Sequence, residues 1–374
     1  MIQLLYSLIY ASTEHVSILA RTLGAAITAA ALVLFFAPWF VRLLKAKGYC
    51  EPSRDFGSLA ASGKAGTPTL GGILIYLVVL ATAILWCKFS TSFTFIPLIA
   101  GVGFGTIGLM DDLRKIRGKS SEAGISRRAK YAGQIVMGAM VAFFFLHPFF
   151  SPISSTATRE SLYLPLWHGG LCLGLGYAAV ILVFMVAASN SVNLTDGMDG
   201  LAIMPTILVA LVLGAMGYIT GRVDFAEYFQ FFPGIDPATH RMAYGLKEAG
   251  ELMVLGAAVA GAGVGFLWFN AHPATIFMGD TGSMALGGML GSMAVLSKQE
   301  VLFFIAGGLF VLECASSFIQ DYIGLKILGR RIFFRAPLHH NMLHNGIAET
   351  KVTVRLWILS VFFAVLALCT LKLR

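Results

Sequence analysis

Two amides and two carboxyls lie close together in the sequence NSVNLTDGMDGLA, residues 190–202. Asn190 and Asn193 are three residues apart, as are Asp196 and Asp199, so each pair would share a face at a helix end. Apolar runs long enough to cross a bilayer flank this stretch. Asn, Asp and Gly are also the usual turn formers, so a plain turn between two membrane helices is the alternative. We favour a functional site, because other acidic and His-rich clusters are expected at the same membrane surface.

A second pair of acids, Asp111 and Asp112, ends an apolar run in LMDDLRKIRG. Adjacent helical side chains point about 100° apart, so the two carboxyls are expected to have different roles. One should face a cleft, while the other orients a neighbour or pairs with a cation such as Lys130. A capping role is disfavoured, because an acid at a helix C-terminus opposes the helix dipole.

A third polar stretch, FNAHPATIFMGDTGSMALGG, covers residues 269–288 and contains Asp280. Asp280 precedes a Thr-Gly-Ser that can start a helix, so it is a candidate N-cap. The nearby Asn270, His272 and Phe277 favour a richer role. As a hard oxygen ligand, Asp280 suits Mg²⁺, which takes one or two carboxylates and fills its other positions with water and substrate phosphates.

A His-rich segment, RRIFFRAPLHHNMLHNG, contains His339, His340 and His344. These residues resemble zinc ligands, but no Cys or Glu stands at a metalloprotease spacing, and the flanking arginines suit a polyanion better. The apolar run before this segment carries Glu313 and Asp321. Ionisable groups inside a membrane are functional by default, although either could pair with a cation at the end of that run.

One Gly-rich stretch, GKAGTPTLGG, contains Lys64. Glycines beside a lysine can bring backbone amides close to an anion, but the spacing is not that of a P-loop. An anion-binding loop and a flexible loop with a lysine on the positive side of the membrane both fit.

The elements that must position these groups are membrane helices. Hydrophobic residues make up 57% of the 374-residue chain, charged residues only 12%, and the mean hydropathy is +0.79. The apolar runs are continuous, which favours helices over a barrel, and the five scattered cysteines indicate no disulfide framework. Taking about 20 residues per span, the sequence predicts about ten transmembrane helices, over residues 17–44, 70–86, 93–110, 131–150, 171–188, 201–220, 252–269, 283–296, 301–325 and 352–371.

The basic residues orient these spans. Of the 27 Lys and Arg, 18 lie in the loops after the first, third and ninth spans or within four residues of those loops. By the positive-inside rule that face is cytoplasmic and both termini lie outside. The net charge of +8 therefore reflects membrane orientation rather than nucleic-acid binding. We expect one transmembrane catalytic domain over residues 1–374, with all the polar clusters at its cytoplasmic face.

We thus expect four kinds of group at one membrane face. They are acids that bind a metal, cations that bind phosphate, aromatics that stack on a nucleotide base, and apolar walls that hold a lipid tail. This combination indicates phosphoryl transfer between a water-soluble nucleotide and a lipid. A transporter is the alternative from another class, but transporters place ionisable groups near the midplane on broken helices within inverted repeats.

Together the motifs resemble those of the polyprenyl-phosphate N-acetylhexosamine-1-phosphate transferase superfamily, most closely its muramoyl branch. The resemblance rests on GKAGTPTLGG, LMDDLRK, NSVNLTDGMDGLA, FNAHPATIFMGDTGSMALGG and APLHHN, which follow the family order along nearly the whole chain. It implies a Mg²⁺-dependent enzyme of the bacterial inner membrane that transfers phospho-MurNAc-pentapeptide from UDP-MurNAc-pentapeptide to undecaprenyl phosphate, giving UMP and lipid I for peptidoglycan. It also implies a homodimer surrounded by membrane lipids. A sister enzyme that uses UDP-N-acetylglucosamine or a similar sugar nucleotide is the nearest alternative.

The resemblance also implies roles for individual residues. Asp280 is similar to the family's metal ligand and Asp111 to its proposed base. The resemblance also implies catalytic roles for Asp112, His339 and His340. The residues that it implies for the substrate pocket are Lys64, Lys130, Asn190, Asn193, Asp196, Asp199, Asn270 and Phe277. One departure concerns the family's triple His, because Asn341 stands in the third position. The sequence leaves open whether the lipid phosphate attacks directly or an aspartyl-phosphate forms on Asp111 or Asp280. We favour direct attack, because a phosphate monoester with a second pKa of about 6 is mostly dianionic at neutral pH.

Overall fold

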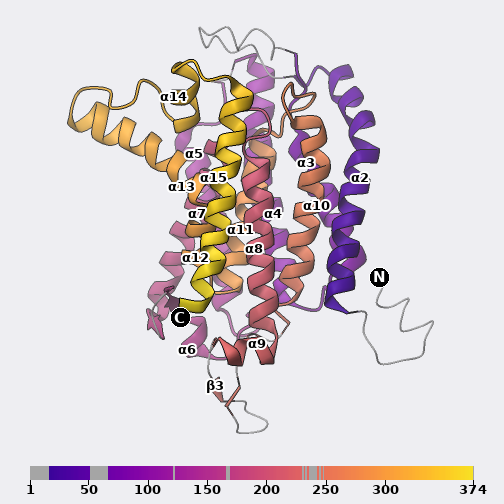
Figure 1. Cartoon of the computed structure of the whole chain (residues 1–374), viewed down its shortest axis with the longest axis vertical. Helices are drawn as coiled ribbons and strands as arrows, with labels where there is room; N and C mark the ends of the chain where they lie inside the picture. The colour runs from indigo at the N-terminus through magenta and orange to yellow at the C-terminus, as the bar shows by residue number, and fades with distance from the viewer. Residues whose placement is uncertain are drawn as a thin grey trace.

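A computed structural model shows the chain as a bundle of helices (Figure 1). The structure describes residues 17–50, 66–120, 123–165, 169–229, 231, 234–235, 242–243, 246 and 248–373. Lys64, which the sequence placed in the substrate pocket, lies outside the described residues.

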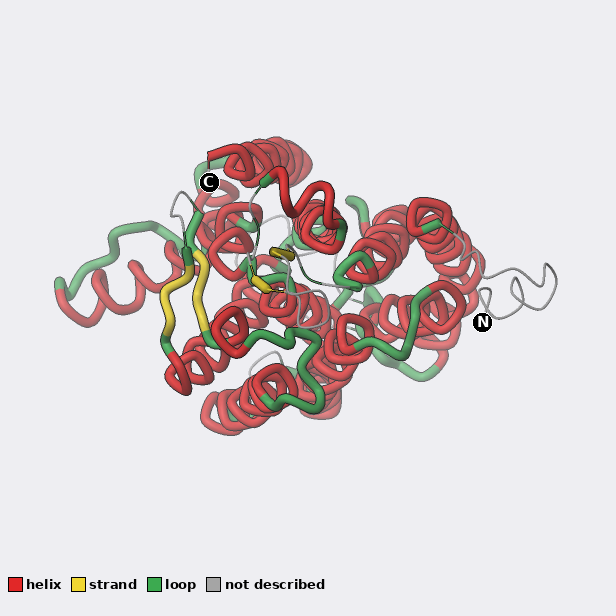
Figure 2. The backbone as a smooth tube through the Cα atoms, turned by 90° about the horizontal axis from the view of Figure 1, so that it is seen from below, coloured by secondary structure: helices red, strands yellow, loops and turns green. Residues whose placement is uncertain are grey.

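Long apolar helices form the bundle, and Figure 2 shows most of them end-on. Seven described helices are long and apolar enough to cross a membrane, or eight if one bent pair counts as a single span. Large apolar side chains such as Phe35 and Trp268 are about three-quarters exposed on its outside, where lipid would cover them. The protein is therefore an all-α, multi-pass membrane protein. Its principal helices are α2 (Ile18–Ala46), α3 (Gly71–Trp86), α4 (Ser92–Gly118), α5 (Arg127–Leu146), α7 (Tyr177–Thr195), α8 (Ile203–Gly221), α10 (Glu251–Asn270), α11 (Gly279–Leu296) and α15 (Glu349–Cys369).

Helix α11 lies at the centre of the bundle and is buried along almost its whole length. It packs against α3, α4, α7 and α8, while α10 packs beside it against α2, α3 and α8. Small residues allow these close approaches, as is usual between membrane helices. A Cβ at Gly72 of α3 would lie 2.1 Å from Cα of Gly282 in α11. This contact brings the start of α3 against the first turn of α11, where the acidic residues gather.

The run predicted as one span over residues 301–325 is broken. Helix α12 (Glu300–Ala306) is followed by α13 (Gly308–Phe318) and the π-helical η3 (Ile319–Ile327), and the two parts are bent by 84°. Gly307 and Gly308 occupy the break, and a Cβ at Gly308 would lie 2.5 Å from the Phe363 ring. The α13–η3 segment projects sideways from the bundle (Figures 1 and 2), and the chain returns through α14 (Leu338–His344). The polar residues Glu313, Ser316 and Gln320 are buried on its inner face.

Short elements occupy the end of the bundle opposite α14, and the C-terminus lies at that end too (Figure 1). Strands β1 and β2 pair antiparallel, with Ser161 opposite Cys172, and β3 and β4 pair with Gly234 opposite Ala243. These short elements lie between the long helices or at their ends. They are α6 (Thr156–Arg159), β1 (Ser161–Tyr163), β2 (Gly170–Cys172), η2 (Gly174–Gly176), α9 (Val223–Tyr228), β3 (Gly234–Ile235) and β4 (Met242–Ala243), with η4 (Thr370–Leu373) ending the described chain.

Candidate active site

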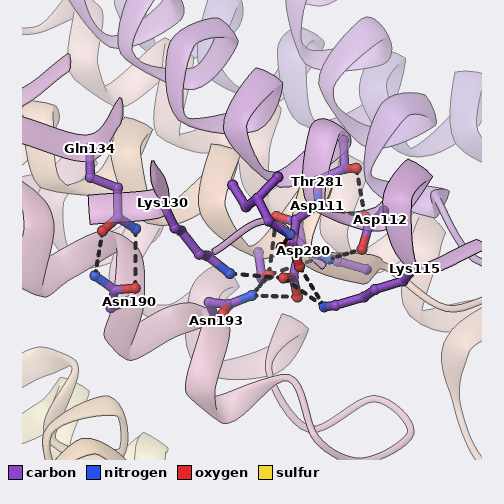
Figure 3. A network of polar contacts seen from close by, with 12 residues as sticks. Asp111, Asp112, Lys115, Lys130, Gln134, Asn190, Asn193, Asp280 and Thr281 are labelled. Carbon is purple, nitrogen blue, oxygen red and sulfur yellow. Dashed lines mark hydrogen bonds and ion pairs between the residues drawn. The ribbon is translucent and has the colours of Figure 1, made fainter. Parts of the chain in front are cut away.

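The candidate site is built around Asp280 in the first turn of α11 (Figure 3). Gly279 precedes it with a φ of 75°, a left-handed conformation that glycine adopts without strain. A Cβ at Gly279 would also lie 2.7 Å from a carboxylate oxygen of Asp112. The glycine therefore lets the chain turn tightly into α11, and an acid in the first turn is favoured by the helix dipole.

The Asp280 carboxylate is surrounded by donors from three other helices (Figure 3). Lys115 Nζ of α4 and Lys130 Nζ of α5 lie 3.0 and 2.9 Å from Asp280 Oδ2. Asn193 Nδ2 of α7 donates to Asp280 Oδ1 at 2.9 Å and also approaches Ser283 Oγ at 2.8 Å. Burial alone raises the pKa of the Asp280 carboxyl, but the two ammonium groups outweigh that effect and hold the pKa well below its usual range. Asp280 is therefore ionised at neutral pH.

Asp111 shares a cation with Asp280. Lys115 Nζ lies 2.6 Å from Asp111 Oδ2, one turn away on the same helix. The second oxygen, Oδ1, accepts from the backbone N–H of Ile125 at 2.8 Å. Asp111 is buried, so its carboxylate is held in one position. The carboxylates of Asp111 and Asp280 thus converge on a single point, now filled by an ammonium group.

The neighbouring Asp112 has a different task. Its Oδ1 accepts from Asp280 N at 3.2 Å, and its Oδ2 accepts from Thr281 N at 2.9 Å and from Thr281 Oγ1 at 2.7 Å. Asp112 therefore caps the N-terminus of α11 from another helix, while Met278, at the N-cap position, makes no side-chain bond. Asp280 is not the N-cap, and the expected partner of the acidic pair, Lys130, contacts Asp280 instead.

The turn after α7 joins the polar stretch of residues 190–202 to that of residues 269–288. Asp199 Oδ2 lies 3.0 Å from His272 Nδ1 and accepts from Ala274 N at 3.1 Å. Asn270, at the end of α10, accepts from Gly200 N at 3.1 Å and donates to Ile276 O at 2.9 Å. Asp196 is half-buried at the C-cap of α7. These bonds fix the turn between α7 and α8 against the loop that leads to Asp280.

The His cluster meets the same turn from its other side. His339 is fully buried, and its ring centroid lies 4.2 Å from that of the half-buried His340. His339 Nε2 is so close to the turn that a Cβ at Gly197 would lie 2.2 Å from it. Residues 193 to 200 therefore contact both Asp280 and His339, which lie on segments far apart in the sequence.

Two predicted site residues make their contacts away from the Asp280 carboxylate. Asn190 exchanges two hydrogen bonds with Gln134 of α5, at 3.1 and 2.9 Å, to one side of the acidic cluster (Figure 3). Phe277 is half-buried, and its backbone N–H donates to Pro68 O at 2.8 Å, which places it beside the chain that enters α3. Lys64 lies outside the described residues.

Sequence reasoning did not select Lys115, Thr281, Ser283 or Gln134 as site residues. A signal existed for Lys115, because an acid and a lysine four residues apart on a helix are neighbours. Gln134 is an amide inside an apolar run, which is itself a sign of a specific partner. Thr281 and Ser283 could only be interpreted as helix-start residues until α4 and α7 were placed beside them.

The donor set fits Mg²⁺. Asp111 and Asp280 offer hard carboxylate oxygens that already converge on one cation, and Mg²⁺ typically takes one or two carboxylates. Asp199, His272 and Glu349 also lie within 4.8 Å of one another. There, however, the imidazole lies within hydrogen-bonding distance of Asp199, and an imidazole is a poorer ligand for a hard ion.

The chain matches the model of a known protein family. The model of the family described as glycosyl transferase family 4 matches residues 94–298, which is more than half of the chain. The matched region runs from α4 to the end of α11 and includes Asp111, Asp112, Lys130, Asn193 and Asp280.

Proposed function

The chain belongs to glycosyl transferase family 4, within the superfamily of polyprenyl-phosphate hexosamine-1-phosphate transferases, and on that premise we propose a specific reaction. The protein transfers phospho-MurNAc-pentapeptide from UDP-MurNAc-pentapeptide to undecaprenyl phosphate, and the products are UMP and lipid I. The family supports a phospho-sugar transferase of the membrane. The muramoyl substrate rests on the motif resemblance, above all on the PLHH sequence that carries His339 and His340.

One observation carries the proposal: two carboxylates and two ammonium groups meet at Asp280, at one end of a membrane-embedded bundle. Phosphoryl transfer needs little covalent chemistry from the protein, because positioning and charge stabilisation supply most of the rate. A site whose carboxylates can bind a metal and whose lysines can bind phosphate oxygens meets that need. A solvent-exposed acidic patch would not, because water would screen its charges.

In the mechanism we propose, Asp280 and Asp111 hold Mg²⁺. When bound, Mg²⁺ neutralises charge on the phosphate oxygens and favours departure of the UMP group. Lys115 and Lys130 turn from the carboxylates to the phosphate oxygens of the two substrates. Asp111 keeps the lipid phosphate in line with the sugar-bearing phosphorus, and Asn193 holds the Asp280 carboxylate in place. The lipid phosphate attacks directly, because it is already mostly dianionic and needs little help from a base.

We propose ten spans in a single domain over residues 1–374, with both termini outside and the site at the cytoplasmic face of the bacterial inner membrane. The loops after the first, third and ninth predicted spans, with the four residues on either side of each, carry 18 of the 27 basic residues. UDP-sugars are made in the cytoplasm, so this orientation gives the donor direct access. A homodimer is proposed from the family resemblance alone.

The test is an assay of purified protein in detergent with undecaprenyl phosphate, Mg²⁺ and one of two donors. UDP-MurNAc-pentapeptide is expected to release UMP, whereas UDP-N-acetylglucosamine is expected to release none. Release from the second donor only would replace the muramoyl assignment with that of a sister enzyme, and the replacement of the third family His by Asn341 makes that comparison necessary. No UMP release from either donor would reject the enzyme proposal in favour of transport.

A further inference from the structure

Glu313 is a fully buried acid on the projecting segment α13, away from the acidic cluster described above. Its Oε2 lies 3.0 Å from His339 Nδ1 and 3.4 Å from the backbone N of His339. Among the residues that the structure describes, His339 is the only ion-pair partner of Glu313. A buried carboxylate without a Lys or Arg is costly unless a polar group satisfies it. The imidazole serves Oε2, while Oε1 is buried without a hydrogen-bond partner among the described residues. A carboxylate on Nδ1 fixes the proton there.

The other ring nitrogen of His339 is unused. Across the described part of the chain, His339 Nε2 has no hydrogen-bond partner although it is buried. It points at Gly197, where a Cβ would lie 2.2 Å away, between Asp196 and the turn that continues to Asp199. A buried polar atom without a partner costs free energy, so its retention indicates a functional contact. The orphan atom therefore faces the polar lining of the candidate site.

The inner face of α13–η3 holds the whole loop that carries His339. Ser316 Oγ accepts from Leu338 N at 3.0 Å, and Gln320 Oε1 accepts from Ile332 N at 3.1 Å and Phe333 N at 2.9 Å. Glu313, Ser316 and Gln320 are spaced to share one face of the helix. All three fix the backbone of the loop, but of the three only Glu313 also contacts the His339 ring. Substitutions at Glu313 and Ser316 can therefore distinguish support of the loop from orientation of the His339 imidazole.

We propose that Glu313 is a positioning residue for phospho-sugar transfer: it holds the proton of His339 on Nδ1, so that the lone pair of Nε2 faces the turn between α7 and α8 and can accept a hydrogen bond from a substrate O–H group. The proposal rests on the proposed function. The proposal gives a role to Glu313, the buried acid of the broken span. It also explains why residue 197 is a glycine, because a side chain there would occupy the position of the His339 ring. Orientation of an imidazole by a carboxylate on its far nitrogen is a common device, and removing such a partner typically lowers activity about 10- to 100-fold.

The test compares Glu313→Gln with Ser316→Ala in the full-length protein. Glu313→Gln should lower kcat about 10- to 100-fold and leave KM for the UDP-sugar within about twofold, because the residue acts on the imidazole and not on the nucleotide. Glu313→Asp, which keeps the charge, should recover part of the kcat. Ser316→Ala removes a loop contact only and should keep kcat within about threefold. Wild-type kcat in Glu313→Gln, or an equal loss in Ser316→Ala, would overturn the proposal.

A readout independent of activity is the ¹⁵N NMR signal of His339 in protein labelled at histidine, identified by its loss in His339→Gln. The wild-type ring should be protonated at Nδ1, and Glu313→Gln should move the proton toward Nε2, while Ser316→Ala should leave the signal unchanged. An unchanged signal in Glu313→Gln would refute the positioning role. If the wild type releases no UMP but the signal shifts as expected, the transfer reaction is wrong and the Glu313–His339 pairing stands.

Discussion

Asp112→Asn is the substitution that most directly separates two roles for the adjacent acids. Both oxygens of Asp112 are used at the start of α11, where they accept from Asp280 N, Thr281 N and Thr281 Oγ1. An asparagine retains one carbonyl oxygen, which can serve either Asp280 N or the two Thr281 donors, depending on the orientation of the amide. In either orientation its NH₂ group faces at least one backbone donor that the carboxylate had satisfied. The cap of α11 is therefore weakened with almost no change in side-chain size.

The size of the effect follows from those bonds. A buried donor left without an acceptor costs about 1–3 kcal/mol. We therefore expect the free energy of unfolding to fall by roughly 1–3 kcal/mol. Because Asp280 is the next residue along α11, its carboxylate should shift. A displacement of about 1 Å at a reacting centre lowers the rate about 100-fold.

Two measurements check this reasoning. Unfolding in mixed micelles should show the loss of stability, and UMP release should show a lower kcat at an unchanged Mg²⁺ requirement. Thr281→Val is the matched control, since it removes only the hydroxyl bond and should cost roughly 1 kcal/mol. If Asp112→Asn is as stable as the wild type but needs far more Mg²⁺, then Asp112 binds the metal and the capping role is refuted.

Three further experiments test other parts of the structure and mechanism. Asp280→Asn should abolish UMP release even with excess Mg²⁺, because an amide is a far weaker ligand; near-normal turnover would remove Asp280 from the metal site. Incubation with radiolabelled UDP-sugar but no lipid acceptor should leave no label on the denatured protein, and a labelled protein band would establish a covalent intermediate. Arg21→Met should destabilise the protein by about 3–5 kcal/mol, because it leaves the buried Glu251 without its cation. The Glu251 oxygens lie 2.6 and 2.9 Å from Arg21. The double variant Arg21→Met/Glu251→Leu should recover most of that stability, and an equally unstable double variant would contradict this account.

Hydropathy was sufficient to predict an all-α membrane protein, because a continuous apolar run in lipid must satisfy its own backbone hydrogen bonds, as a helix does. It could not predict the break at Gly307. Residues 301–325 have the length and composition of one span, yet the second part buries Glu313, Ser316 and Gln320 on one face. That pattern was visible in the sequence. Its meaning depends on the returning loop that these side chains bind, and no local signal specifies such a partner.

The clustering of polar residues could be predicted in outline, because loops on alternate connections of a helical bundle lie at the same end. The pairing could not. The adjacent acids were expected to have different roles, one of them orienting a neighbour, and Asp112 does so by capping α11. Lys130 was named as a cation for that pair, but it contacts Asp280. These contacts join α4, α5 and α11, whose relative rotation depends on the packing of small residues such as Gly72 and Gly282.

The charges of the site also explain why a divalent cation is expected. Asp112 is satisfied by backbone N–H groups, which leaves the carboxylates of Asp111 and Asp280 balanced by Lys115 and Lys130. These two acids and two lysines carry equal and opposite formal charges. On the proposed function, a lipid phosphate and a nucleotide diphosphate would bring several negative charges into a partly buried space, where their repulsion is poorly screened. The lysines can turn to the phosphates only if another cation replaces them at the two carboxylates. A divalent ion held by Asp111 and Asp280 would satisfy both requirements.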